Sequence, residues 1–312
     1  MKYWQRIAAS LALLAGMTGM APAFAADNGK QEQIEKSQAQ DAICTRCHDH
    51  NEQKPVLSIH KTAHGVKADG RTPTCQSCHG TSEDHVKNST NASERPAVDR
   101  FGPKAKSDRP KDVQACVACH NSGKRSHWQG SAHEKADVVC TNCHQMHTQN
   151  DRVRNKATQP EVCFACHKEQ RAQYTRPSRH PIKEGKMACS DCHNPHGSAG
   201  PTLMLRDSVT ATCYTCHMEK RGPFVRSHQP VQEDCSICHN PHGTTTPNLL
   251  KARPPFLCQQ CHEPSTHQGR NASLTGTATG ANTLARGCLN CHTNIHGTNN
   301  PANINNERTM RR

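Results

Sequence analysis

The stretch MACSDCHNPHG, residues 187–197, contains the pattern that decides the fold: two cysteines three positions apart, with a histidine directly after the second. The same Cys-x-x-Cys-His unit occurs ten times and uses all 20 cysteines of the chain. The cysteine pairs are Cys44 and Cys47, Cys75 and Cys78, Cys116 and Cys119, Cys140 and Cys143, Cys163 and Cys166, Cys189 and Cys192, Cys213 and Cys216, Cys235 and Cys238, Cys258 and Cys261, and Cys288 and Cys291. The histidines that follow are His48, His79, His120, His144, His167, His193, His217, His239, His262 and His292.

This spacing has a chemical reason. Two thiols three residues apart can add to the two vinyl groups on one edge of a haem, and the adjacent imidazole then reaches the iron. Disulfides need no histidine after each pair, zinc sites do not require one beside every pair, and a thioredoxin-type motif would occur once. Ten complete units without a spare cysteine therefore predict ten covalently bound haem c groups.

The composition indicates that the bound haems, rather than apolar side chains, form most of the core. Aromatic residues make up 3% and hydrophobic residues 33% of the 312 residues, too little apolar surface to offset the conformational entropy of folding. The regions between motifs lack the periodicity of long helices or strands. We therefore expect a multihaem cytochrome c fold, mostly irregular, with short α-helices around the motifs, a haem-based core and an elongated chain of haems.

Thirteen histidines remain after the ten motif histidines are removed from the total of 23. They are His50, His60, His64, His85, His127, His133, His147, His180, His196, His228, His242, His267 and His296. This number would give each iron a second imidazole, which fills the open coordination position and omits the methionine that raises potential. The sequence therefore favours low-potential electron carriers over substrate-binding haems.

Spacing selects ten of these as distal ligands. His147, His196, His242 and His296 follow a motif histidine by three or four residues, too near to reach the opposite face of the same haem, so each must ligate another haem. Four more lie seven to eleven residues before a motif, namely His64, His133, His180 and His228, and two lie just after one, namely His85 and His267. Three exchanges remain open, since His60 competes with His64, His127 with His133, and His50 with His85.

The N-terminus has the features of a secretory signal peptide over residues 1–25. Lys2 and Arg6 precede a short apolar run, and Ala23-Phe24-Ala25 is a small-x-small cleavage site. Export places the chain in the periplasm. The motifs divide evenly, which predicts an N-terminal five-haem half at 26–175 and a C-terminal five-haem half at 176–312.

The formal charge of +13 invites a nucleic-acid partner. Haem propionates would offset most of this charge, and the basic side chains are better interpreted as their counter-charges. Export also separates the chain from nucleic acid, so we predict no such partner.

Taken together, these residues resemble the periplasmic decahaem cytochromes of the MtrA/DmsE type. The resemblance is strongest in MACSDCHNPHG, CYTCHMEKRGP, CSICHNPHG, LCQQCH and GCLNCHTNIHG between Met187 and Gly297, and extends to SHWQGSAHEKADVVCTNCHQMH at 126–147. It implies that the ten selected histidines are ligands. It also implies a decahaem chain inside an outer-membrane β-barrel porin, with periplasmic or inner-membrane donor cytochromes and an outer-surface multihaem cytochrome or reductase as partners.

Three functions are compatible with these features. A conduit for electrons across the outer membrane, serving extracellular electron transfer, is preferred. A soluble periplasmic electron shuttle is the first alternative. A multihaem reductase of a nitrogen or sulfur oxyanion is the second, and it would need a haem with an open or weakly held coordination position. The sequence does not give the direction of electron flow.

Overall fold

The computed structural model describes residues 23–49, 55–88, 95–102, 109–262, 288–290, 292–300 and 310. The chain divides into two compact units. Unit 1 comprises residues 1–116 with 145–149, and unit 2 comprises 117–144 with 150–312. The predicted signal peptide lies mostly outside the described residues, and its cleavage after Ala25 stays a prediction. The division at residue 175 into two five-haem halves also stays a prediction.

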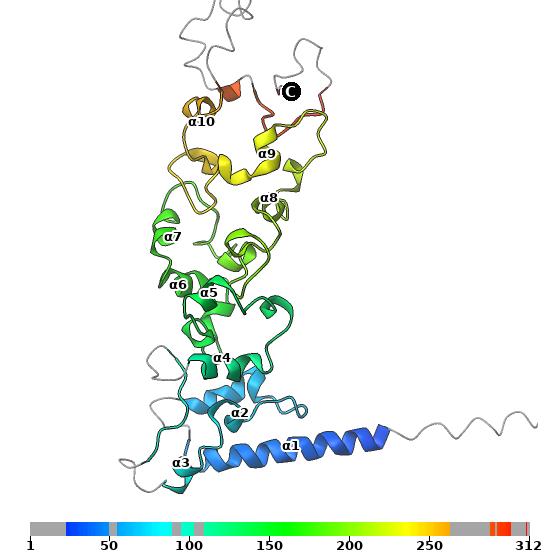
Figure 1. Cartoon of the computed structure of the whole chain (residues 1–312), viewed down its shortest axis with the longest axis vertical. Coiled ribbons are helices and arrows are strands. Elements are labelled where there is room, and N and C mark those ends of the chain that lie inside the picture. The colour runs from blue at the N-terminus through cyan, green and yellow to red at the C-terminus, as the bar shows by residue number, and fades with distance from the viewer. Residues whose placement is uncertain are drawn as a thin grey trace, which may run out of the picture. The chain divides into compact units, whose positions relative to one another are not determined.

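Short helices joined by irregular segments make up the described chain, apart from one long helix (Figure 1). The α-helices are α1 (Ala23–Thr45), α2 (Cys75–His79), α3 (Glu83–Lys87), α4 (Arg109–Val117), α5 (Ala132–Lys135), α6 (Gln159–Phe164), α7 (Lys168–Gln173), α8 (Val209–Cys213), α9 (Gln229–Glu233) and α10 (Phe256–Gln259). Strand pairing over the described residues is limited to isolated bridges. The prediction of a mostly irregular chain with short α-helices around the motifs is confirmed.

Single turns of 3₁₀-helix supply most of the remaining regular structure. They are η1 (Val56–Lys61), η2 (Ala63–Gly65), η3 (Gly123–Arg125), η4 (Cys140–Asn142), η5 (Arg152–Arg154), η6 (Cys189–Asp191), η7 (Pro201–Leu203), η8 (Met218–Lys220), η9 (Cys235–Ile237), η10 (Pro247–Leu249) and η12 (Cys288–Asn290). Four of them, η4, η6, η9 and η12, begin at the first cysteine of a motif. Regular structure therefore concentrates at the motifs, as expected.

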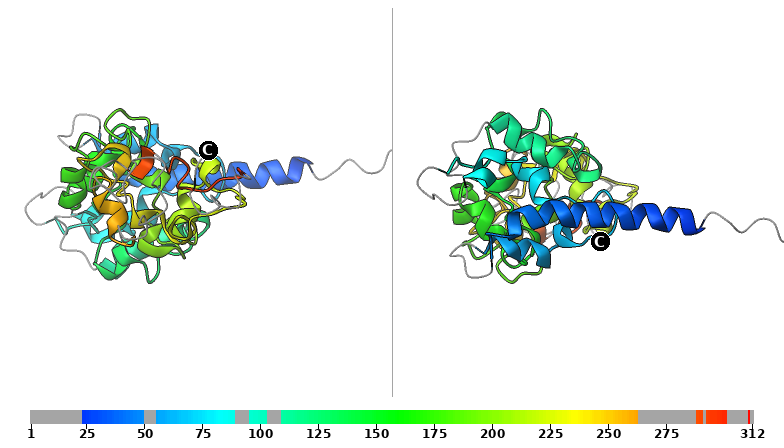
Figure 2. Two further views of the ribbon diagram at one scale, coloured as in Figure 1. Left: turned by 90° about the horizontal axis from the view of Figure 1, so that it is seen from above. Right: turned by 90° about the horizontal axis from the view of Figure 1, so that it is seen from below.

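The long helix α1 was not expected beyond the signal peptide. Its N-terminal end extends away from the other elements of unit 1, whereas its C-terminal part packs against α2 (Figures 1 and 2). Near that end the buried Asp41 carboxylate accepts a hydrogen bond of 2.8 Å from the Cys75 backbone and forms a 2.6 Å ion pair with Lys67. The helix thereby connects the first two motifs. None of the described helices combines the length and hydropathy that crossing a bilayer requires.

The apolar core of the polypeptide is small. Phe164, Tyr174 and Ile182 form one buried cluster in unit 2, with Met187 packed against it. Many other buried side chains are polar, among them Thr210, Thr212, Thr244 and Thr246. Apolar burial of this extent gives little stabilisation, which agrees with a core that depends on bound haem.

A repeated loop follows two of the motifs in unit 2. The backbone amide of Asn194 donates to the Leu203 carbonyl at 2.7 Å, and the backbone amide of Leu205 donates to the Cys192 carbonyl at 2.9 Å. The next copy reproduces both bonds, from Asn240 to Leu249 at 2.8 Å and from Lys251 to Cys238 at 2.9 Å. The similar sequences CHNPHG at 192–197 and 238–243 thus fold into the same closed loop.

Glycine is required where each loop meets another segment. Gly197 and Gly243 have φ of +106° and +142°, a region that residues with a side chain rarely adopt. A Cβ at Gly197 would collide with the His127 carbonyl, and one at Gly243 would collide with the Gln173 carbonyl. These glycines let the loop approach the backbone of an upstream segment.

Candidate haem sites

Eight of the motifs close a helical turn. In these the backbone amide of the motif histidine donates to the carbonyl of the first cysteine at 2.9–3.2 Å, for example from His193 to Cys189 at 3.0 Å and from His48 to Cys44 at 3.2 Å. Residues three apart on such a turn lie on the same side, so the two thiols face one edge of a planar ligand. No disulfide joins any of the described cysteines. We name each site by its first cysteine.

The second cysteine of a motif is less covered by the polypeptide than the first. The described first cysteines are all partly buried, whereas seven second cysteines are exposed. These seven are Cys47, Cys78, Cys119, Cys143, Cys166, Cys216 and Cys261. An exposed thiol on a motif turn is open on the side where a haem would bind.

Three of these exposed thiols, Cys47, Cys78 and Cys119, lie in the N-terminal part of the chain. The described residues of unit 1 hold no counterpart of the buried apolar cluster of unit 2. An exposed thiol is accessible for addition to a haem vinyl group, so exposure is compatible with the predicted chemistry. Thioether attachment at these three cysteines stays a prediction.

Cysteines of successive motifs lie next to each other. The first cysteines of two motifs share a side-chain hydrogen bond in the pairs Cys44–Cys75, Cys163–Cys189, Cys213–Cys235 and Cys258–Cys288. The second cysteines are electrostatic neighbours in the pairs Cys143–Cys166, Cys192–Cys216 and Cys238–Cys261. In unit 2 the two kinds of pair alternate, so each motif from Cys163 to Cys258 meets its predecessor through one cysteine and its successor through the other.

This proximity changes the acidity of the thiols before thioether bonds form. Burial, together with hydrogen bonding to Asp41, raises the pKa of Cys75 to about 12. The hydrogen bond between Cys163 and Cys189 raises the pKa of Cys163, and burial adds to that rise. The same hydrogen bond lowers the pKa of Cys189 against the opposing effect of burial. Most of the perturbed thiols are therefore protonated near neutral pH, a consequence of their closeness and burial.

Motif histidines face non-motif histidines in eight pairs among the described residues. In unit 1 the pairs are His48–His85 and His79–His147, with ring centroids 6.4 and 6.0 Å apart. In unit 2 they are His144–His196 (6.1 Å), His167–His133 (6.1 Å), His193–His242 (6.1 Å), His217–His180 (6.3 Å), His239–His296 (6.1 Å) and His262–His228 (5.9 Å). Every non-motif histidine in these pairs belongs to the set selected by spacing.

The separation is what an ion between two imidazoles requires. A metal–imidazole bond of about 2.0 Å and a further ~1.1 Å to the ring centre give roughly 6.2 Å between the centroids of two rings on opposite sides of one metal. The eight observed distances run from 5.9 to 6.4 Å. The residues present thus fit a haem iron bound from both sides.

Backbone carbonyls orient many of these rings. Among motif histidines, Nδ1 lies 2.6 Å from the Asp99 carbonyl in His79, 2.9 Å from Thr202 in His193 and 2.8 Å from Asn248 in His239. Among the others, the carbonyl partners of Nδ1 are Val56 for His147, Pro96 for His85, Pro195 for His133 and Pro241 for His180. A carbonyl only accepts, so Nδ1 must carry the proton and Nε2 is left free to bind metal.

One motif histidine has a carboxylate in this role. Nδ1 of His144 lies 2.7 Å from Oδ2 of Asp151, and the Asp151 side chain is 11% exposed. Glu219 approaches His217 more loosely, at 3.7 Å, and its side chain is 61% exposed. The Cys140 site therefore has a close negative charge behind one imidazole.

The CHNPHG loop serves three sites at once. His193 belongs to the Cys189 site, the Pro195 carbonyl orients His133 opposite His167, and His196 faces His144 of the Cys140 site. The second copy, two motifs further along the chain, repeats the arrangement. The Pro241 carbonyl orients His180 opposite His217, and His242 faces His193. In both loops, the second histidine of CHNPHG thus pairs with the motif histidine of the site two motifs earlier in the chain.

Four of the non-motif histidines are partly buried. Burial lowers the pKa of His196, His228, His242 and His296 below the ordinary value of 6.5, and nearby cationic groups add to the shift. A neutral imidazole is the form that binds metal, so these rings are ready to act as ligands at neutral pH.

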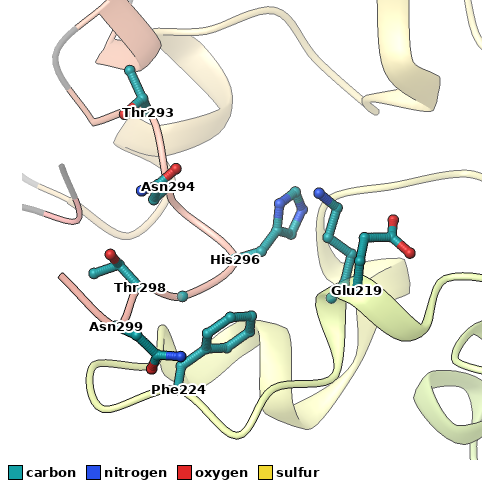
Figure 3. Close-up of a pocket in the computed structure, with 9 residues that line it drawn as sticks. Glu219, Phe224, Thr293, Asn294, His296, Thr298 and Asn299 are labelled. Atoms are coloured by element: carbon teal, nitrogen blue, oxygen red, sulfur yellow. The ribbon is translucent and has the colours of Figure 1, made fainter. Parts of the chain in front are cut away.

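A polar cavity of about 310 Å³ lies beside one of them. Figure 3 shows the His296 ring between Glu219 and the segment that contains Asn294, with Phe224 below. Phe224 packs against Gly297, whose φ is +134° and where a Cβ would collide with the ring. The cavity thus opens onto the non-motif histidine of the Cys235 site.

Some predicted residues are not assigned to a pair. His64, His120 and His292 interact with neighbouring residues, and their ligand roles stay predictions. His267 and Cys291, with the alternative ligand His50, lie outside the described residues. His60 and His127, the other two alternatives, are exposed.

Comparisons with known proteins agree with this geometry. The family described as Doubled CXXCH motif matches residues 180–222 and 228–267, and the NrfB-like cytochrome c-type family matches residues 75–159. Multiheme cytochrome MtrA of Shewanella baltica is 44% identical over 269 residues, which cover 83% of this chain and 78% of that protein. The chain belongs to the MtrA family of multihaem cytochromes. The cytochrome c-type protein NrfB of Haemophilus influenzae is 26% identical over 162 residues, 45% of this chain and 70% of that protein.

As a member of the MtrA family, the chain binds haem c through its Cys-x-x-Cys-His motifs and acts in multihaem electron transfer. Sequence reasoning missed the residues that orient the paired histidines, namely Asp151 and the carbonyls of Pro195 and Pro241. The repeated proline of CHNPHG was a visible signal for the two carbonyls. Asp151 lies seven residues after His144, and no repeated sequence pattern in the chain points to its role.

Proposed function

We propose that this chain carries ten haem c groups in a row and conducts electrons across the outer membrane inside a β-barrel porin, for extracellular electron transfer. The observation that carries the proposal is the unbranched order of cysteine contacts from Cys140 to Cys288 in unit 2. When bound, each haem supplies a one-electron ferric/ferrous couple.

Because both cysteines of a motif would hold a single haem, cysteines that lie together would hold haems that are close neighbours. The alternation of first-cysteine and second-cysteine pairs gives every internal site in this series two neighbours and no branch. That order favours passage from site to site over collection at one centre.

We further propose that every iron has two histidine ligands. The motif histidine is the proximal ligand, and His64, His85, His133, His147, His180, His196, His228, His242, His267 and His296 are the distal ligands. The centroid distances of the eight described pairs support this assignment. Imidazoles on both faces leave no position for a substrate, so the chain is an electron-transfer protein rather than an enzyme.

The family and the N-terminal sequence support a proposed localisation and a proposed set of partners. A signal peptide at 1–25 would export the chain to the periplasm, and the MtrA resemblance favours association with the outer membrane. The partners would be a β-barrel porin, an outer-surface multihaem cytochrome or reductase, and periplasmic or inner-membrane donor cytochromes. No nucleic acid is involved.

The test is transport across a bilayer. The chain is co-expressed with an outer-membrane porin of the same organism, the complex is purified and placed in liposomes, and a reduced dye is sealed inside. Addition of an impermeant external oxidant should oxidise the dye only in liposomes that contain both proteins. A haem-loaded chain that never co-purifies with a barrel, and that leaves the dye reduced, would exclude the conduit and favour the soluble shuttle.

The oxyanion reductase is tested separately by electron paramagnetic resonance of the oxidised protein. Two histidines on every iron predict low-spin ferric signals alone. A stoichiometric high-spin signal that changes when nitrite or a sulfur oxyanion is added would favour the enzyme.

A further inference from the structure

The Cys140 site differs from the Cys189 and Cys235 sites in the groups behind its imidazoles. His144 faces the Asp151 carboxylate at 2.7 Å, whereas Nδ1 of its counterpart His196 is buried with no hydrogen-bond partner. At the Cys189 and Cys235 sites the motif histidine donates to a neutral carbonyl, from Thr202 and Asn248. One imidazole of the Cys140 site is thus made more electron-rich than its equivalents.

The contact is held in place by the fold. The Asp151 side chain is 11% exposed and directly precedes η5 (Arg152–Arg154). Thr158 donates to the Arg152 carbonyl at 2.6 Å, and Gln159 donates to the Val153 carbonyl at 2.8 Å. The loop that presents Asp151 is therefore anchored to the start of α6, and little water separates the carboxylate from the ring.

We propose that Asp151 is a positioning residue that gives the haem of the Cys140 site a lower potential than the haems whose motif histidines donate to carbonyls. A carboxylate that accepts the Nδ1 proton increases the basicity of the metal-bound nitrogen. A more basic ligand stabilises ferric over ferrous iron, since ferric iron bears the greater positive charge. This inference rests on the proposed pair of His144 and His196 as ligands.

The consequence would be one haem of lower potential within the series of sites. The Cys140 site adjoins the Cys163 site through Cys143 and Cys166. A lower potential there would make it the last of the neighbouring sites to be reduced when electrons are scarce, and would set a threshold for passage through this point.

The experiment compares D151N and D151A with D207N, which alters an exposed carboxyl, in the full haem-loaded chain. Optical redox titration should show the amplitude of one haem moving to higher potential in D151N and further in D151A, with no change in D207N. Haem content and thermal unfolding check that each variant is folded. Unchanged titrations in both Asp151 variants would overturn the proposal.

A marker variant identifies the haem and separates this proposal from the ligand assignment. Replacing His196 with Met should raise the potential of the same haem, because methionine ligation raises potential. If D151N moves a component other than the one moved by H196M, the Asp151 proposal is wrong. If H196M leaves every haem with two histidine ligands by spectroscopy, the ligand assignment itself fails.

Discussion

At the scale of single residues, His242 is the most direct test of the ligand pairs. It faces His193 with ring centroids 6.1 Å apart, and burial lowers its pKa. In H242A the iron of the Cys189 site should lose one ligand and become five-coordinate, since no imidazole replaces it. We expect one high-spin ferric signal and carbon monoxide binding by a single haem in the reduced protein.

The control is H127A, which removes an exposed histidine from the group that spacing left over. It should stay entirely low-spin and bind no carbon monoxide. An H242A protein with all haems attached and no high-spin signal would refute the pairing with His193.

Gly243 tests the close approach of the CHNPHG loop to an upstream backbone. Its φ is +142°, and an added Cβ would collide with the Gln173 carbonyl. G243A should lower the free energy of unfolding by at least about 1–3 kcal/mol, because the backbone is strained for alanine and the carbonyl must move. Denaturant unfolding followed by circular dichroism measures the loss.

Gly29 is the matched position for that prediction. It lies in α1, and no atom lies within 4 Å of an added Cβ. Alanine is the better helix former there, so G29A should not destabilise the protein. Equal losses in G29A and G243A would show that the loop contact is not the cause.

At the scale of elements, the buried carboxylate of Asp41 joins α1 to the motif in α2. Burial alone would raise the pKa of Asp41, but hydrogen bonds from Lys67 and from the Cys75 backbone lower it below 3.8. A carboxyl with a lowered pKa stabilises the folded state above its ordinary pKa, and this stabilisation is lost as the pH falls below 3.8 toward the folded value. D41N should therefore cost about 1–3 kcal/mol near neutral pH.

The same variant should also unfold with a shallower dependence on pH in the acid range, since the titrating group is gone. D69N is the comparison, because Arg71 holds the pKa of Asp69 at about 2 but the pair lies on the surface. Exposed ion pairs contribute little, so D69N should leave stability at neutral pH unchanged. A D41N protein as stable as D69N would show that α1 is not held by this carboxylate.

Elements also show where sequence reasoning reaches its limit. Local spacing predicts the turn at Cys189–His193 because the motif itself dictates that turn. It does not predict that His180 faces His217 or that His228 faces His262, since these pairs depend on how loops pass one another. The helix α1 was missed because its residues show no apolar stripe. Polar contacts hold it instead, namely the Asp41 carboxylate on Cys75 and Lys67 and the Gln33 side chain on the Gly70 backbone.

At the scale of the molecule, contacts between the haem-binding motifs take the place of a large apolar core. The buried apolar cluster at Phe164, Tyr174 and Ile182 is too small to stabilise the described part of the chain. The CHNPHG loops instead bring residues of three sites together, so each haem that binds would fix the ligands of its neighbours. This interdependence explains why motif spacing is the same in both loops while the segments between motifs differ in length.

An unbranched series of sites predicts that the loss of one internal haem interrupts the whole series. In C213A/C216A the Cys213 site loses both attachment thiols, and the contacts to Cys192 and Cys235 on either side no longer join neighbouring haems. Transport in the liposome assay should fall to the rate of porin alone. H180M is the matched variant, since it keeps the haem and its spacing while changing one ligand, and it should retain transport. If the double variant, with the other nine haems attached, still transports at the original rate, electrons have a parallel route and the sites do not form a single file.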